Sequence, residues 1–193
     1  MKKKLPILIV IPARSGSKRL KGKNKIKFKG LPLFMHSVKA AQNTDRETRV
    51  IVSTDDREII DYCCKEKIEI QRRSKILALD YAAKQDVIVD VCKELWEKEF
   101  YIPDIIISLQ ANSPEVDNNL LKKSIESFEK LPTVNGCKEL VCINSNGKQN
   151  GSIRIMTYKT VFQKTLSTYL GTFTKDLVDI HTQSDLDTLK LEK

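Results

Sequence analysis

The basic segment from Arg14 to Lys29 holds the residues of this chain whose types and spacing most clearly suggest chemistry. It reads RSGSKRLKGKNKIKFK, with eight basic residues, two serines, two glycines and no acidic residue, and it follows the apolar run LPILIVIPA of Leu5 to Ala13. Backbone N–H groups of glycine and serine donate to phosphate, lysine and arginine supply charge, and a following helix N-terminus adds its dipole. The pattern therefore predicts a phosphate-binding loop after a buried strand.

The net charge of the protein is concentrated in this loop. The 193 residues include 34 basic and 25 acidic side chains, which gives +9 at pH 7, and the loop alone contributes +8. This concentration favours a compact polyanion, such as a nucleoside triphosphate, over an anionic membrane. No aromatic residue interleaves the basic residues before Phe28, although stacking on single strands favours such residues. We therefore expect no nucleic-acid partner. The alternative is a solvated, lysine-rich loop without a ligand.

The spacing of the loop glycines excludes two familiar nucleotide-binding motifs. Gly16 and Gly22 are separated by five residues instead of four, and Asn24 follows Lys23 where a P-loop has serine or threonine. The dinucleotide pattern G-x-G-x-x-G is absent. The loop must therefore hold its ligand in another way.

Cysteine usage and hydropathy indicate the compartment. The five cysteines are odd in number and form no C-x-x-C pair, so we expect reduced thiols. No segment approaches the roughly 18–20 apolar residues that span a membrane, and the basic start at Lys2 to Lys4 lacks a cleavage pattern. We expect a cytoplasmic protein without a membrane partner.

Strands and helices that alternate along the chain must position the loop. The predicted strands are short runs rich in β-branched residues at Leu5–Pro12, Arg49–Ser53, Ile68–Gln71 and Asp104–Leu109. The predicted helices are Pro32–Gln42, Asp56–Lys65, Gln85–Lys98 and Asp117–Lys130, with Asp56 and Asp117 as expected N-caps. This order predicts an α/β fold, a three-layer αβα sandwich around a mostly parallel, Rossmann-like sheet.

The later part of the chain is less regular. The segment Lys130–Gly151 carries proline, glycine and asparagine and predicts a crossover or excursion from the main sheet. Further strands and the cap of a closing helix are expected at Leu140–Asn144, Ser152–Met156 and Leu177–Ile180 and at Ser184 or Asp185. Since no repeat or low-complexity tract divides the chain, we expect a single domain over 1–193 with a shortened excursion at about 131–151.

Polar residues follow each of the first four predicted strands. Ligands of open α/β sheets bind beyond the carboxyl ends of the strands, so these residues are expected to meet in one site. They are Arg14–Asn24, Ser53–Asp55, Arg73 and Gln110–Asn112.

The loop IPARSGSKRLKGKN, from Ile11 to Asn24, resembles the signature loop of the CMP-sialic acid synthetase family, the cytidylyltransferases that activate acidic sugars. Further matches follow in the family's order over nearly the whole chain. They are GLPL at Gly30–Leu33, VIVSTDD at Val50–Asp56, RSKILALD at Arg73–Asp80, LQANSP at Leu109–Pro114, NGSIRI at Asn150–Ile155 and VDIHTQSDL at Val178–Leu186.

The resemblance implies a CTP-dependent nucleotidylyltransferase that transfers CMP to a nonulosonic (sialic-type) sugar acid, releases pyrophosphate and feeds surface polysaccharide biosynthesis. It implies Gln110 against the sugar acid and Asp179 as a Mg²⁺ ligand, and it implies CTP and an acidic sugar as partners. Catalytic roles fall on Lys23, Arg14 and His181. The nucleotide-binding residues would be Arg14, Ser15, Lys18, Lys23, Asn24 and Arg73, the last of which could instead form a structural ion pair.

The chain also departs from the family's pattern. His181 replaces a second metal-binding aspartate, and imidazole suits Mg²⁺ less well than oxygen does, so His181 is a candidate proton acceptor. Tyr81–Lys84 replaces a serine-containing element of the base pocket. The gap from Pro114 to Asn150 is short, which weakens the homodimer that the resemblance implies. The alternatives are transfer of another nucleotide or sugar, and a non-catalytic nucleotide-binding homologue.

Overall fold

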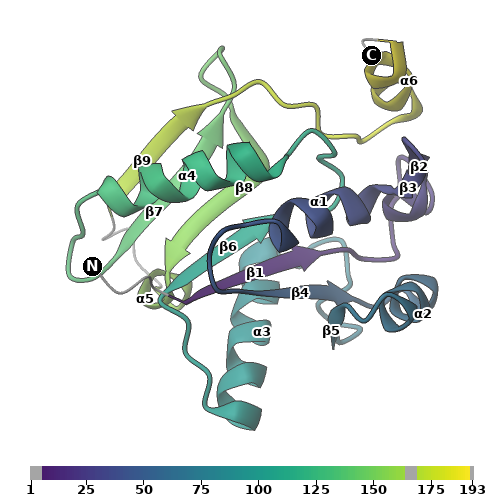
Figure 1. Ribbon diagram of the computed structural model, residues 1–193. Coiled ribbons are helices and arrows are strands. Elements are labelled where there is room, and N and C mark those ends of the chain that lie inside the picture. The colour runs from purple at the N-terminus through teal and green to yellow at the C-terminus, as the bar shows by residue number, and fades with distance from the viewer. Residues whose placement is uncertain (1–5, 164–168, 192–193) are drawn as a thin grey trace.

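The computed structural model describes residues 6–163 and 169–191 and places seven strands in one sheet (Figure 1). Leu5, the first residue of the first predicted strand, lies outside the described residues. The strands are β1 (Ile7–Pro12), β2 (Lys27–Phe28), β3 (Leu31–Pro32), β4 (Thr48–Thr54), β5 (Glu69–Arg72), β6 (Ile105–Leu109), β7 (Lys138–Ile143), β8 (Gln149–Thr157) and β9 (Tyr169–Thr174). The helices are η1 (Lys23–Lys25), α1 (Leu33–Gln42), α2 (Arg57–Lys65), α3 (Lys84–Glu99), α4 (Asn118–Lys130), α5 (Tyr158–Val161) and α6 (Gln183–Leu191).

The sheet order is β5-β4-β1-β6-β8-β7-β9, and β2 and β3 form a separate small ribbon. The first half of the sheet is parallel, because β1 pairs parallel with both β4 and β6, and β4 pairs parallel with β5. Strand β8 is antiparallel to β6 and β7, and β9 runs parallel to β7. A mostly parallel sheet begun by a buried strand is therefore confirmed.

Helices cover both faces of the sheet, as alternate residues of β1 show. Ile7, Ile9 and Ile11 pack in one core with buried residues of α1, α2 and α4. Leu8 and Val10 point to the other face and pack with buried residues of α3 and α5. These are the three layers that the alternating pattern predicts.

The predicted helix starts are confirmed at two positions. The Asp56 carboxylate accepts the Glu58 and Ile59 N–H groups at 3.0 and 3.4 Å, and the Asp117 carboxylate accepts the Leu120 N–H at 2.7 Å. Each interaction satisfies an otherwise unpaired donor of the first turn.

The cap predicted for the closing helix is wrong by two or three residues. Helix α6 begins at Gln183, so Ser184 and Asp185 lie within its first turn. The Thr182 hydroxyl accepts the Asp185 N–H at 3.3 Å, and the Asp185 carboxylate accepts the Thr182 N–H at 2.7 Å. This reciprocal pair is a capping box that begins at Thr182.

The predicted strand Leu177–Ile180 is also wrong. Leu177 and Ile180 are buried and Val178 is partly buried, but the segment does not join the ladder of the sheet. The Ile180 N–H donates to the Asn112 carbonyl at 2.9 Å, and Ile180 packs with Phe28, Leu186 and Leu189 beneath α6. Strand β9 (Tyr169–Thr174) lies just before it in the chain.

The segment predicted as an excursion contributes to the main sheet. Strand β7 lies between β8 and β9, where backbone hydrogen bonds on both sides hold it in the ladder. The turns on either side of β7 contain the left-handed Asn135 and Gly136 before it and Gly147 after it.

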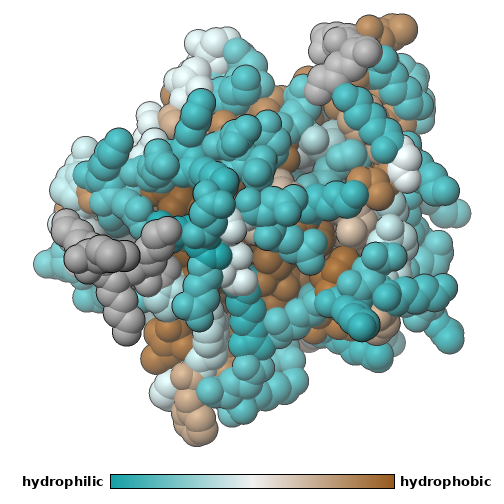
Figure 2. Space-filling model, in the orientation of Figure 1, coloured by the Kyte–Doolittle hydropathy of each residue, from teal (hydrophilic) through white to brown (hydrophobic). Residues whose placement is uncertain are grey.

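Hydrophilic residues cover most of the face shown in Figure 2. Among the described helices, none is long and apolar enough to cross a membrane.

Candidate functional site

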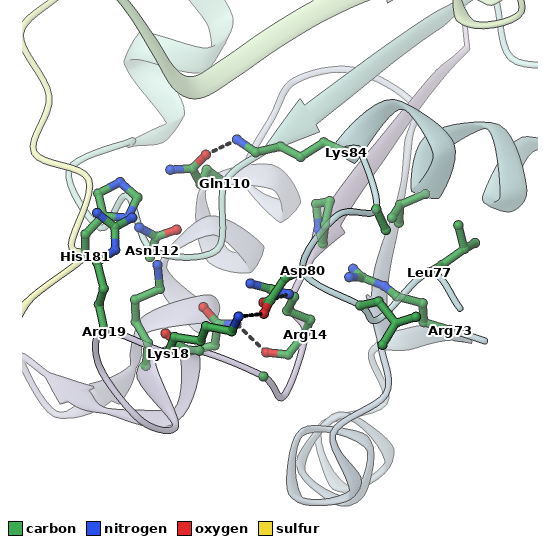
Figure 3. A pocket seen from close by; sticks show the side chains of 18 residues that line it. Arg14, Lys18, Arg19, Arg73, Leu77, Asp80, Lys84, Gln110, Asn112 and His181 are labelled. Atoms are coloured by element: carbon green, nitrogen blue, oxygen red, sulfur yellow. Dashed lines mark hydrogen bonds and ion pairs between the residues drawn. The ribbon is translucent and has the colours of Figure 1, made fainter. Parts of the chain in front are cut away.

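A cavity of about 480 Å³ opens at the carboxyl ends of β1 and β6, beside the loop that follows β1 (Figure 3). Among its described lining residues Asp80 is the acidic side chain, so the cavity is strongly cationic. The basic residues that line it are Arg14, Lys18, Arg19, Lys23, Arg73 and Lys84. Such a wall favours an anionic ligand.

Backbone geometry and two side chains fix the basic loop. The Ser15 N–H donates to Asp55 Oδ1 at 2.8 Å, and the Ser15 hydroxyl donates to Oδ2 of the same carboxylate. The buried Asn24 amide donates to the Arg14 carbonyl at 3.1 Å, which closes the loop on itself. Gly22 has the left-handed φ of 64° just before η1, a conformation that glycine adopts without strain.

Lys23 lies near other cations in the cavity wall. Burial lowers its pKa to about 8, and repulsion by Arg19 adds to that shift, while Asp179 opposes it. At neutral pH Lys23 is still mostly charged, and a bound anion would strengthen that charge.

Arg73 is buried under the same cavity. Its Nη2 group donates to the Ser53 carbonyl at 2.8 Å and its Nε group to the Ser53 hydroxyl at 3.3 Å. Burial lowers its pKa to about 10, so it stays charged at neutral pH. Its hydrogen-bonding partner is thus Ser53, and Leu77 lies beside it in the cavity wall.

Asp80 forms ion pairs with two cations of the loop. Its carboxylate accepts from Arg14 Nη1 at 2.6 Å and from Lys18 Nζ at 2.5 Å. These hydrogen bonds from Lys18 and Arg14 lower the pKa of Asp80. Because the three side chains are partly or largely exposed, water screens these ion pairs and a ligand anion can compete for the cations.

Lys84, Gln110, Asn112 and His181 also line the cavity, with His181 beside Arg19 of the loop (Figure 3). The Lys84 ammonium donates to Gln110 Oε1. Asn112 Nδ2 donates to the Ile180 carbonyl at 2.6 Å, so it ties the β6 end to the segment before α6.

The tautomer of His181 follows from its partner. Arg19 Nη2 lies 3.1 Å from His181 Nδ1, and a guanidinium can only donate, so Nδ1 accepts and a neutral ring carries its proton on Nε2. Burial, followed by repulsion from Lys23 and Arg19, lowers the pKa of His181 and favours this neutral form.

Asp179 lies behind the cavity wall. Its Oδ1 accepts from the Ser113 and Ser152 hydroxyls, the latter at 2.9 Å. Within 6–163 and 169–191 no group of three histidine, cysteine, aspartate or glutamate residues is placed to hold a metal ion. Asp179 therefore offers one carboxylate, whose charge opposes the lowering of the pKa of Lys23 and of Lys84 in the cavity wall.

The structure brings most of the predicted site residues together. The residues that line the cavity as predicted are Arg14, Lys18, Lys23, Asn24, Arg73, Gln110 and His181. Ser15 turns to Asp55, and Asp179 lies behind the wall, so neither lines it.

Sequence reasoning assigned no role in the cavity to Arg19, Asp80 or Lys84. Arg19 lies within the basic loop itself, and Asp80 closes the matched RSKILALD element, so both were marked by motif. Lys84 is the first residue of α3, one position before the predicted start. A charged residue at the head of an apolar helix that follows the third strand is a signal that could have found it.

A family model described as cytidylyltransferase matches residues 8–170. The chain is similar to the pseudaminic acid cytidylyltransferase of Campylobacter jejuni subsp. jejuni serotype O:2, with 36% identity over 122 residues that cover 63% of this chain and 52% of that protein. It is also similar to the CMP-N,N'-diacetyllegionaminic acid synthase of Legionella pneumophila, with 32% identity over 121 residues that cover 62% and 52%. These matches span about half the length of the relatives.

Solved structures share the fold. A CMP:2-keto-3-deoxy-manno-octonic acid synthetase complexed with CTP has a TM-score of 0.73 at 17% identity and covers 98% of both chains. A manganese complex of a Mycobacterium tuberculosis protein has a TM-score of 0.65 at 11% identity and covers 96% of this chain and 98% of that one. At these identities the likeness concerns the fold.

Proposed function

The chain belongs to the cytidylyltransferase family, and on that premise we propose that it transfers CMP from CTP to a nonulosonic sugar acid and releases pyrophosphate. The observation that carries the proposal is the cationic cavity at the strand ends, built mainly by the loop that follows β1. Four cations from this loop, Arg14, Lys18, Arg19 and Lys23, can balance the roughly four negative charges of a bound triphosphate.

The nucleotide lies along the loop. Arg14, Lys18 and Lys23 contact the triphosphate, and Asn24 faces the phosphates and ribose. Ser15 shapes the nucleotide site from behind, because its N–H and hydroxyl donate to Asp55 and hold the loop in place. Asp80 releases Arg14 and Lys18 when the phosphates arrive, because its ion pairs are partly exposed.

The base lies against Arg73. This guanidinium is held by Ser53, and Leu77, Leu79 and Val87 supply apolar surface for a flat ring. Arg73 thus gives the base pocket a fixed donor, and a base carbonyl is a suitable acceptor for it.

The transfer is an in-line displacement at the α-phosphate. A hydroxyl oxygen of the sugar acid forms the new P–O bond, the bond to the β-phosphate bridging oxygen breaks, and pyrophosphate leaves. Lys23 and Arg14 stabilise the charge that develops on the phosphates. The hydroxyl proton passes to Nδ1 of His181, which becomes free when Arg19 turns from the ring to the triphosphate. Gln110 faces the sugar acid.

Asp179 is the residue that would hold a divalent cation. One carboxylate fits Mg²⁺, because this ion is commonly held by one or two carboxylates together with substrate phosphates. The Ser113 and Ser152 hydroxyls orient Asp179 by donating to its other oxygen. When bound, the ion would neutralise phosphate charge.

The remaining partners follow from this reaction. We place the enzyme in the cytoplasm, where the five free cysteines stay reduced, and assign it no nucleic-acid partner. A homodimer is retained as a proposal for the assembly, and surface polysaccharide precursors as the destination of the product.

A pyrophosphate-release screen with Mg²⁺ tests the proposal. The full chain is given CTP, UTP, ATP or GTP with pseudaminic or N,N'-diacetyllegionaminic acid. We expect release only with CTP and an acid, and at least a roughly 100-fold loss of rate in Lys23→Ala and in Asp179→Ala. The matched control Lys27→Ala removes an exposed cation of β2 outside the cavity and should keep its rate.

Retained turnover in both variants would contradict the assigned roles. Release that depends on another nucleotide would instead favour a transferase of different specificity, and tight CTP binding without release would favour a non-catalytic homologue.

A further inference from the structure

Lys84 and Gln110 form a pair on the side of the cavity away from the basic loop (Figure 3). Lys84 is the first residue of α3, and Gln110 follows the end of β6. The Lys84 ammonium donates a hydrogen bond to Gln110 Oε1. The pair therefore joins two elements that are far apart in the sequence.

This hydrogen bond sets the direction of the Gln110 amide. The backbone of Gln110 is fixed, since its N–H donates to the Ser152 carbonyl at 3.0 Å and its carbonyl accepts the Ser37 hydroxyl at 2.9 Å. With Oε1 held by Lys84, the amide presents Nε2 to the cavity. The remaining ammonium protons and the amide N–H then form two neighbouring donors with one positive charge, which match the two oxygens of a carboxylate.

Within the described part of the chain, the charge of Lys84 has no acidic partner at contact distance. Among the described residues no carboxylate forms an ion pair with Lys84, and its hydrogen-bonding partner is a neutral amide. Although the residue as a whole is exposed, burial of the ammonium group lowers the pKa of Lys84. The negative charge of Asp179 opposes this shift. The loop cations already balance a triphosphate, so Lys84 is a surplus charge in the same cavity.

Gly151 makes room for the pair. It lies in β8 with its α-carbon against the two side chains, and a Cβ atom there would clash with both Gln110 Oε1 and Lys84 Nζ. The side chains of Lys84 and Gln110 thus pack against the backbone of β8 at Gly151.

We propose that Lys84 and Gln110 bind the carboxylate of the acceptor sugar, and that Lys84 determines the preference for an acidic acceptor over a neutral one. This inference rests on the proposed function, because it takes the acceptor to be a sugar acid. It assigns a role in acceptor binding to Lys84, a cation on α3. This cation is separate from the loop cations that bind the nucleotide.

Calorimetry on the full chain tests this assignment without requiring turnover. Pseudaminic acid, N,N'-diacetyllegionaminic acid and their methyl esters are titrated in the presence of a CTP analogue with a non-cleavable α,β bridge. We expect the wild-type protein to prefer acid over ester by roughly 10- to 100-fold, the range for a hydrogen bond between charged groups. In Lys84→Met the preference should fall to within about threefold, with affinity for the CTP analogue changed less than about threefold.

Lys93→Met is the matched control, because it removes an exposed lysine from the same helix and changes the net charge equally. It should retain the wild-type preference. An unchanged preference in Lys84→Met, or a loss that falls on the CTP analogue and not on the acid, would overturn the assignment.

Failure of the inference and failure of the proposed function give different results. If the preference for acid over ester depends on Lys84 but the protein releases no pyrophosphate, the transfer reaction is contradicted and the carboxylate site is supported. Turnover by wild type with an unaltered preference in Lys84→Met would contradict only the carboxylate site. Binding of neither acid would contradict both.

Discussion

At the scale of single residues, burial and neighbouring positive charges lower the pKa values of lysines in the cavity. Burial and the neighbouring Arg19 lower the pKa of Lys23 to about 8, and burial lowers that of Lys84. An ammonium group in such surroundings is stabilised when an anion arrives, so binding of a triphosphate should raise the pKa of Lys23 and couple ligand affinity to pH.

The affinity for CTP should therefore fall as pH rises through the pKa of free Lys23. Below about pH 8 the side chain is charged and attracts phosphate, and above it the free protein loses that charge. Between pH 7 and pH 9 we expect a decrease in affinity of about five- to tenfold in wild type, measured by calorimetry at constant ionic strength. Lys23→Arg keeps its charge over this range and should show a flatter profile. Equal slopes in the two proteins would assign the titration to another group.

The phosphate-binding role of the basic loop could be proposed from the sequence, because the types and spacing of its residues are typical of phosphate binding. Lys84 and Asp80 could not be given their places in the same way. Asp80 lies in the irregular stretch between β5 and α3, and Lys84 is the first residue of α3 directly after it. The path of that stretch depends on contacts such as the Arg73 N–H to the Thr54 carbonyl at 2.9 Å. No local pattern encodes such a contact.

At the scale of elements, apolar runs predicted the parallel strands well and failed where an edge strand is polar. Strand β9 pairs with β7 and exposes Tyr169, Leu170 and Thr172, so it lacks the continuous apolar run of β1. In the segment just after it, Leu177 is buried in the core with residues of α1 and α4, Ile180 is buried under α6, and neither belongs to a strand. Burial alone thus does not distinguish a strand from a packed loop.

Gly171 gives this edge strand a testable contact. A Cβ atom at this position would come within 2.6 Å of Leu131 Cδ1 at the end of α4, so Gly171→Val should overpack the contact between β9 and α4. We expect a loss of about 1–3 kcal/mol in the free energy of unfolding, measured by urea denaturation. The neighbouring Thr172→Val, whose side chain is exposed, is the control. Equal midpoints for the two variants would show that Leu131 moves aside without cost.

At the scale of the whole molecule, the two halves of the sheet position different residues of the site. The parallel half, β5-β4-β1-β6, places the basic loop, Arg73 and Gln110 at one edge. The half that contains β8 supplies Gly151 and Ser152, and the segment before α6 brings Asp179 and His181 to the same edge. The order of elements predicted the first half, whereas the second depends on antiparallel pairing of β8 with both β6 and β7, which the sequence does not specify locally.

The net charge of +9 has a functional meaning at this scale, because most of it lies in the loop that follows β1. In the proposed enzyme this charge attracts the nucleotide, and the smaller charge of Lys84 selects the acceptor. Nucleotide affinity should accordingly depend more strongly on ionic strength than acceptor affinity does.

In the proposed enzyme, one cavity joins CTP to a sugar acid. Pyrophosphate release by the full chain, with CTP, Mg²⁺ and pseudaminic or N,N'-diacetyllegionaminic acid, tests it most directly when the CMP-sugar product is followed by mass spectrometry. We expect release that requires both substrates, with one CMP-sugar formed for each pyrophosphate. Tight binding of CTP with no product from either acid, or release that is indifferent to the acid, would contradict it.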